Sequence, residues 1–134
     1  MKTTVLVDNK AKNYFYGEDG FSLHIEHEGK KILLDTGTTD LFIKNAQKMN
    51  INLKDIDYIV LSHGHYDHTG GLKHLVRYFK DIESQNIEYK KPVIISHPLA
   101  FNKKYKESKD NKGITKHIDI GLENKEEIKE FFDI

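Results

Sequence analysis

The chain has 134 residues, of which 37% are hydrophobic and 31% charged, a composition typical of one globular domain. Basic and acidic residues both number 21, so no net charge favours nucleic acid or a membrane surface. The absence of cysteine excludes disulfides and thiolate metal ligands. Since the chain also lacks a signal-peptide core and any apolar run of membrane-spanning length, we expect a cytoplasmic protein that binds neither nucleic acid nor membrane.

The first predicted elements are strands. The short β-branched run at 3–8 is typical of a strand. Apolar and polar residues alternate over 21–29, and a Glu-Gly turn signal leads into a second apolar run at 28–35. We therefore expect an antiparallel hairpin there, and we interpret its two histidines, His24 and His27, as surface residues.

The middle of the chain predicts two helices around a strand. Apolar residues at helical spacing predict a helix over 38–51, with Thr38 or Thr39 as its N-cap. The continuous apolar run at 55–62 is typical of a strand buried on both faces. An amphipathic pattern predicts a second helix over 70–82.

The last third continues the alternation. We expect a buried strand over 91–97, a lysine-rich loop over 101–113, a strand over 114–120 and a helix over 122–134. Strands that alternate with helices indicate an α/β layered fold. The lysines of the loop are interpreted either as a solvated surface or as contacts for a phosphate-bearing substrate.

One stretch concentrates chemistry: residues 62–71 read SHGHYDHTGG, with His63, His65, Asp67 and His68 close together. The stretch lies between a predicted strand and a predicted helix, and in α/β folds ligands bind at the carboxyl ends of strands. Imidazole and carboxylate groups are ligands for zinc, manganese or iron. The spacing therefore predicts a site for one or two metal ions, although a solvated histidine-rich turn shows the same residues.

Two neighbouring metals would give these residues distinct tasks. His63 and His65 can bind one ion, while Asp67 and His68 bind a second. Two ions share a bridging water, which they acidify into a hydroxide nucleophile. Asp67 is the candidate catalytic residue because its carboxylate can orient that nucleophile or accept its proton. A metal loop without catalysis is the alternative.

The segment HGHYDH matches the HxHxDH motif of the metallo-β-lactamase superfamily. With ILLDTG before it and HPLAF after it, LSHGHYDHTGGL resembles the branch of dihydropterin ribofuranosylaminobenzene phosphate synthase-like hydrolases. The resemblance spans roughly residues 3–120 and implies part of an αββα sandwich with one or two metal ions, zinc or else manganese or iron. It implies a metal-dependent hydrolase whose metal-bound hydroxide attacks an ester, lactone or phosphoester of a small-molecule substrate.

The resemblance also assigns roles to single residues. His63 and His65 would bind the first metal, and Asp67 and His68 the second. Asp35 would orient a ligand histidine through its carboxylate, unless it is only a turn residue of DTG.

His97 stands apart from the motif. It ends the predicted strand 91–97 and is a candidate extra ligand or substrate contact, with a packing role at the strand end as the alternative.

The sequence departs from the superfamily pattern after residue 120, where no further ligand histidine follows. We therefore expect 1–134 to be a single domain that represents the N-terminal βα half of the sandwich, incomplete or completed by self-association. Such a half leaves an apolar sheet face uncovered, which favours a homo-oligomer or a second chain that supplies the other half. The alternative function is a truncated, catalytically impaired relative that binds metal or dimerises.

Overall fold

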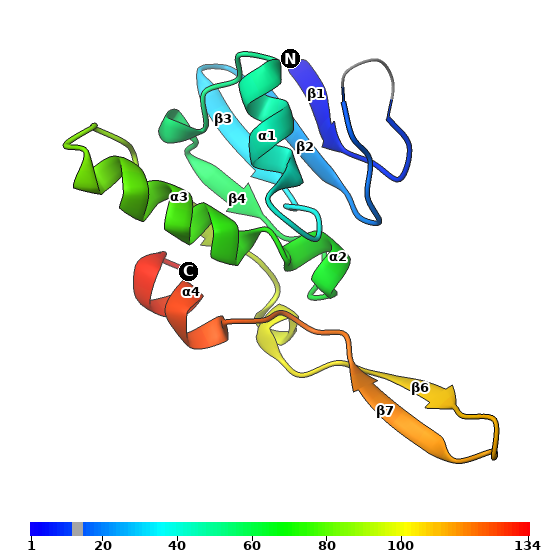
Figure 1. The fold of residues 1–134 in the computed structure, drawn as a ribbon. Coiled ribbons are helices and arrows are strands. Elements are labelled where there is room, and N and C mark those ends of the chain that lie inside the picture. Colours follow the sequence, from blue (N-terminus) through cyan, green and yellow to red (C-terminus); the bar gives the residue numbers. More distant parts are fainter. Residues whose placement is uncertain (12–14) are drawn as a thin grey trace.

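The computed structural model describes residues 1–11 and 15–134, and its centre is a five-stranded mixed sheet with the order β1-β2-β3-β4-β5 (Figure 1). The strands are β1 (Lys2–Val7), β2 (Ser22–His27), β3 (Lys30–Leu34), β4 (Tyr58–Val60) and β5 (Val93–Ile95). The first three pair antiparallel, whereas β3, β4 and β5 run parallel. The hairpin expected over 21–35 is confirmed, and so is the α/β class.

Helices cover one face of this sheet (Figure 1). The helical elements are α1 (Leu41–Lys48), α2 (Tyr66–Thr69), α3 (Leu72–Ser84) and α4 (Lys125–Phe131), with short 3-10 turns at Leu53–Asp55 and Pro98–Phe101. A separate hairpin of β6 (Tyr105–Lys109) and β7 (Thr115–Asp119) projects from the body (Figure 1). In the described part of the chain, no helix has the length and apolar character needed to cross a bilayer.

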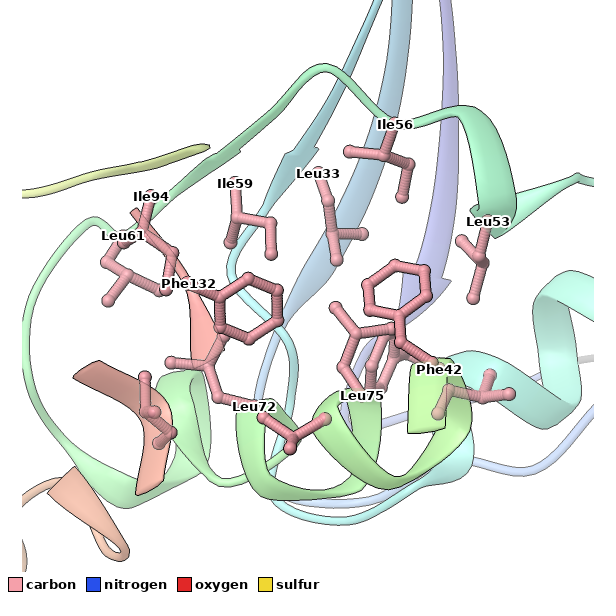
Figure 2. Packing of buried hydrophobic residues seen from close by; sticks show 14 of the residues in the cluster. Leu33, Phe42, Leu53, Ile56, Ile59, Leu61, Leu72, Leu75, Ile94 and Phe132 are labelled. Atoms are coloured by element: carbon pink, nitrogen blue, oxygen red, sulfur yellow. The ribbon is translucent and has the colours of Figure 1, made fainter. Parts of the chain in front are cut away.

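The core lies between the sheet and its helices. Leu33 of β3 and Ile59 of β4 meet Phe42 of α1 and Leu72 and Leu75 of α3, and all five are fully buried (Figure 2). The apolar positions of α3 recur at three- and four-residue spacing, which places them on one helix face. Burial of large apolar side chains of this kind stabilises the fold by roughly 1.5–3 kcal/mol each.

The opposite face of the sheet carries apolar rows that no described helix covers (Figure 1). Strand register places Val5, Leu23, Leu34, Val60 and Ile95 side by side across all five strands. A second row contains Thr3, Ile25, Ile32, Tyr58 and Val93. The members on the outer strands are the most open, since Val5 is 48% and Ile95 49% exposed. This agrees with the expected uncovered sheet face.

Two strand predictions need correction. The strand expected over 91–97 is short and buried on one face only, because Val93 and Ile95 face outward while Ile94 faces the core. The strand expected over 55–62 is likewise short, and its outer residues are half-buried. Apolar sequence runs predicted burial on both faces, but residues 1–11 and 15–134 cover only one face of these strands.

The expected helix 38–51 was too long, and its N-cap position is Asp40 rather than Thr38 or Thr39. The side chain of Asp40 makes no capping hydrogen bond, but Oγ1 of Thr39 accepts from the backbone N–H of Leu41, the first helical residue, at 3.2 Å. Glu18 in turn accepts hydrogen bonds from the backbone N–H groups of Thr38 and Thr39, at 2.9 and 3.1 Å. A residue distant in sequence therefore holds the segment in a turn before the helix begins.

Two further predictions were wrong. The segment 101–113, expected to be a loop, contains β6, which pairs with β7. His24, interpreted as a surface residue, is only 2% exposed. Its register with Leu33 and Ile59 places it on the core face of the sheet. The helix expected over 122–134 is present but shorter.

Candidate metal centre

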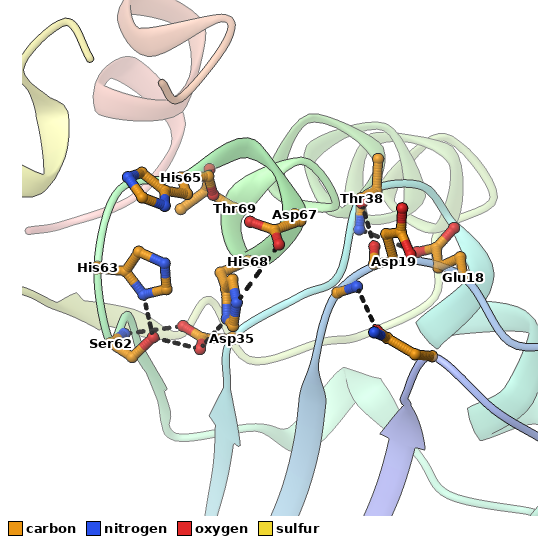
Figure 3. A network of polar contacts seen from close by, with 12 residues as sticks. Glu18, Asp19, Asp35, Thr38, Ser62, His63, His65, Asp67, His68 and Thr69 are labelled. Carbon is orange, nitrogen blue, oxygen red and sulfur yellow. Dashed lines mark hydrogen bonds and ion pairs between the residues drawn. The ribbon is translucent and has the colours of Figure 1, made fainter. Parts of the chain in front are cut away.

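The histidine-rich loop lies at the carboxyl edge of the parallel strands. Asp35 follows β3, and the loop that begins at Ser62 follows β4. Because β3 and β4 are parallel neighbours, both segments emerge at the same edge of the sheet. Figure 3 shows Asp35, Ser62, His63 and His68 gathered there.

Asp35 is the buried anchor of this site. It is 1% exposed, and its carboxylate accepts hydrogen bonds from Ser62 N at 2.8 Å and Ser62 Oγ at 2.5 Å. Nδ1 of His68 lies 2.8 Å from Oδ2, the same oxygen that accepts from Ser62 Oγ. The backbone of Asp35 has a φ of +55°, a left-handed conformation that aspartate tolerates better than most residues.

These contacts determine which ring nitrogen carries the proton in His63 and in His68. An ionised carboxylate only accepts, so Ser62 Oγ and His68 Nδ1 must both donate to Asp35. Ser62 has then used its single hydroxyl proton, and His63 Nδ1, 2.8 Å away, must donate to Ser62 Oγ. In the neutral form of each ring, the network therefore places the proton on Nδ1 and leaves Nε2 of His63 and of His68 with a free lone pair.

The loop histidines lie close together. The ring centroid of His63 is 4.6 Å from that of His65 and 4.2 Å from that of His68. Two groups of side chains could each bind a metal ion, because the ligand atoms within each group lie within 4.8 Å of one another. One group is Asp35, His63 and His68, and the other is His63, His65 and Asp67. The structure thus gathers the motif residues and Asp35 in one cluster, and their division between two ions stays a prediction.

The donor set fits a divalent metal. Nε2 of His68 lies 3.8 Å from Oδ2 of Asp67 (Figure 3). In the neutral ring with its proton on Nδ1, this nitrogen has a lone pair, so a divalent cation between the two atoms would be bound by both. Burial and the neighbouring rings of His68 and His65 lower the pKa of His63 below its usual value, although Asp35 and Asp67 act in the opposite direction. A lowered pKa favours the neutral form of His63, which is the form that binds metal.

Tight backbone contacts hold the loop in place. Thr36 N donates to the carbonyl of His68 at 2.8 Å, and Thr36 Oγ1 donates to the same oxygen. A Cβ on Gly71 would lie 2.4 Å from the carbonyl oxygen of Thr36, and one on Gly64 would lie 2.1 Å from that of Ala100. Only glycine permits this close packing.

His97 lies beside the cluster rather than in it. It borders a cavity together with Ser62 and His63, but it belongs to neither group of candidate ligands. Its role as ligand or substrate contact stays a prediction. Sequence reasoning did not single out Ser62, although a hydroxyl between a strand end and the first motif histidine was a usable signal. It also gave no special place to Lys104, which borders the same cavity.

A histidine- and aspartate-rich loop at the carboxyl edge of a mixed α/β sheet defines a class of metal-binding folds. The chain belongs to the metallo-beta-lactamase superfamily, whose family model matches residues 16–91. A solved metal-dependent hydrolase of the beta-lactamase superfamily shares the fold with a TM-score of 0.65 and 26% identity, and the match covers 98% of this chain and 41% of that one.

Two archaeal relatives are similar to parts of the chain. An uncharacterized protein of Methanocaldococcus jannaschii is 41% identical over 101 residues, which is 75% of this chain and 36% of that protein. A 7,8-dihydropterin-6-methyl-4-(beta-D-ribofuranosyl)-aminobenzene-5'-phosphate synthase from the same organism is 48% identical over 63 residues, 43% of this chain and 21% of that protein. This chain therefore spans less than half the length of each of these relatives.

Proposed function

We propose that this chain forms the metal centre of a hydrolase, with His63, His65, Asp67 and His68 as ligands of one or two divalent ions. The network His63–Ser62–Asp35–His68 carries the proposal, because it directs two Nε2 lone pairs into one cluster before any ion binds. Carboxylate support of this kind also raises the basicity of a ligating imidazole. Zinc, manganese and iron all suit this donor set.

The proposed reaction is hydrolysis of an ester, lactone or phosphoester in a small-molecule substrate. The metal would supply Lewis acidity and a nucleophile derived from water at neutral pH. Asp67 is partly exposed, at 33% of its side chain, so it can reach both the cluster and solvent. We propose that its carboxylate orients the attacking water or accepts its proton. Asp35 is buried, and its hydrogen bond to Nδ1 holds the ring of His68 in one orientation.

A second candidate is a metal-binding protein without turnover. It is favoured by the ligand count: among the described residues, only the loop and Asp35 contribute to the two candidate groups. His117, on the exposed strand β7, belongs to neither group.

Metal titration separates these candidates. The purified chain is titrated with Zn²⁺, Mn²⁺ and Fe²⁺ against a competing chelator, with His65→Ala as the test variant. His74→Ala, on α3 and outside both candidate groups, is the matched control. The proposal requires binding of one or two ions that is lost only in His65→Ala, together with hydrolysis of generic esters or phosphodiesters. Stoichiometric binding without hydrolysis would support the second candidate, and equal binding by both variants would refute the centre.

We also propose that polypeptide from outside this chain covers the open sheet face. The solved relative supports this occupant, because more than half of its chain lies outside the match. The outward rows offer the alternating apolar side chains that sheet-on-sheet packing requires. Ile95→Lys should then increase the solubility of the isolated chain without changing metal affinity. A stable homodimer of the isolated chain in light scattering, disrupted by Ile95→Lys, would instead identify a second copy as the occupant.

A further inference from the structure

A cavity of about 250 Å³ opens beside the histidine-rich loop at 62–71, which we call the metal loop. It is bordered on one side by Ser62, His63 and Gly64, and on the other by His97, Leu99 and Lys104. The two sides come from segments far apart in sequence, and they meet where the turn at Pro98–Phe101 packs against the loop. A group held in this cavity would lie next to the candidate ligand His63.

Lys104 differs from its lysine neighbours. Lys103 and Lys106 are exposed, whereas Lys104 is half-buried and its stem lies close against Gly64. Its ammonium donates to the carbonyl oxygen of Leu99 at 2.6 Å and, more weakly, to that of Asn102 at 3.5 Å. An ammonium has three donors, so one is left for a ligand. Among the described residues, no carboxylate forms an ion pair with Lys104.

His97 adds a second donor. Its Nδ1 accepts a hydrogen bond from the backbone N–H of Leu99 at 3.1 Å. That nitrogen therefore carries no proton, and in the neutral ring the proton lies on Nε2. The ring of His97 thus carries an N–H group and borders the same cavity as Lys104.

Hydrogen bonds fix this side of the cavity to the metal loop. Ile120 N donates to the carbonyl oxygen of Lys104 at 2.8 Å, and Tyr66 N donates to that of Ile120 at 2.9 Å. Tyr66 begins α2, inside the histidine motif. The backbone of Lys104 is therefore positioned relative to the candidate ligands by two successive bonds, not by a free loop.

We propose that Lys104 and His97 form a subsite for an oxyanion group of the substrate, a phosphate or a carboxylate, beside the metal centre. A fixed ammonium and an imidazole N–H are donors that suit anionic oxygens, and charge-assisted hydrogen bonds of this type are the stronger ones. The role of the subsite in substrate recognition rests on the proposed hydrolase function. Oxyanion binding itself does not, and it is measured separately.

The test uses the metal-free chain, so that phosphate cannot coordinate a metal. Inorganic phosphate and acetate are titrated separately, and binding is followed by amide chemical shifts of Gly64 and Leu99. Lys104→Met should weaken binding of the preferred anion about tenfold, whereas Lys103→Met, an exposed lysine one residue away, should leave it unchanged. The tighter of the two anions identifies the group. No binding of either anion by the unmodified chain, or equal losses in both variants, would overturn the proposal.

Metal binding is measured on the same variants. Lys104→Met should keep the metal affinity of the unmodified chain, and His65→Ala should lose metal while it still binds the anion. If anion binding is independent of Lys104 but metal binding depends on His65, the subsite fails and the proposed function stands. If His65→Ala leaves metal affinity unchanged, the proposed function fails while the anion measurement still decides the subsite. In a metal-loaded chain that shows turnover, Lys104→Met should raise KM for anionic esters and leave KM for neutral esters unchanged.

Discussion

The carboxylate of Asp35 lies 2.8 Å from Nδ1 of His68, and the same carboxylate also binds Ser62. Asp35→Asn keeps the shape of the side chain but replaces one acceptor oxygen by an NH₂ donor. Ser62 Oγ and His68 Nδ1 share Oδ2 of Asp35, whereas Ser62 N donates to Oδ1. The NH₂ group of the amide must therefore face at least one of these donors, and this weakens the support of the His68 ring. We expect a loss of about 10- to 100-fold in metal affinity, the range typical for such supporting residues, measured by chelator competition.

Asp57→Asn is the matched control. Asp57 is also a buried carboxylate, 8% exposed, but it lies before β4, at the amino end of that strand, where it accepts from Lys31 N at 2.8 Å and contacts Lys90. The control should reduce the free energy of unfolding without changing metal affinity. Equal loss of metal affinity in both variants would mean that Asp35 acts only through stability.

Ser62→Ala tests the other half of the network. Without the hydroxyl, Nδ1 of His63 loses its acceptor, and the ring is free to adopt the other tautomer. We expect metal affinity to fall by up to about tenfold, less than for Asp35→Asn. The bonds of the hydroxyl to His63 and to Asp35 are lost, but His68 keeps its carboxylate partner. Nitrogen NMR of the imidazoles reports the tautomer directly. His63 should carry its proton on Nδ1 in the unmodified metal-free chain and shift toward Nε2 in the variant.

Ser84→Ala, at the end of α3, controls for the loss of a hydroxyl far from the site. It should change neither the tautomer nor the affinity. If His63 in the unmodified chain already carries its proton on Nε2, the proposed direction of the network is wrong.

Much of the fold was predictable because residues close together in the sequence determine these elements. The hairpin at 21–35 follows from alternation around a Glu-Gly turn, and Glu28 and Gly29 do adopt positive φ. Helix α3 follows from its apolar spacing. The cluster of His63, His65 and Asp67 was visible as a motif after a strand, and the structure brings these side chains within ligand distance of one another.

What sequence reasoning missed depends on contacts between distant segments. The burial of His24 is set by its register with Leu33, which alternation alone cannot assign to a face. The exposure of Ile95 depends on whether a layer covers it. Lys104 looks like its exposed neighbours in the sequence, and only the packing of its stem near Gly64 distinguishes it.

Gly64→Ala should disrupt the loop by steric conflict. The new Cβ would lie 2.1 Å from the carbonyl oxygen of Ala100, so the loop must move away from the turn at Pro98–Phe101. We expect a loss of roughly 1–3 kcal/mol in the free energy of unfolding, as for other overpacked sites, together with weaker metal binding. Urea unfolding and metal titration measure the two effects.

Gly113→Ala is the comparison. Nothing lies within 4 Å of a Cβ at Gly113, although its φ of +76° makes alanine strained there. This variant should lose only about 1 kcal/mol from backbone strain and should bind metal normally. A Gly64→Ala chain that keeps both its stability and its metal affinity would show that the loop relaxes without consequence.

We expect His24 to make the stability of the fold depend on pH. It is 2% exposed, and Nε2 has no hydrogen-bond partner among the described residues. Burial, the largest cause, lowers its pKa in the folded chain, with smaller contributions from Lys31 and Lys2, whereas Glu26 and Asp55 act in the opposite direction. The unfolded chain, with a histidine pKa of about 6.5, therefore takes up a proton more readily than the folded one. The stability contribution is fully present above about pH 6.5 and is lost as the pH falls below it.

His24→Leu removes both the titrating group and the unpartnered nitrogen. We expect the variant to lose less of its free energy of unfolding between pH 7.5 and 5.5 than the unmodified chain, in urea titrations with chelator present. His27→Leu is the control, because His27 is on the same strand with 53% of its side chain exposed, and it should keep the pH dependence of the unmodified chain. Since His63 also has a lowered pKa, His24→Leu should reduce the dependence without abolishing it. Parallel stability curves for His24→Leu and the unmodified chain would show that the buried ring of His24 does not control acid stability.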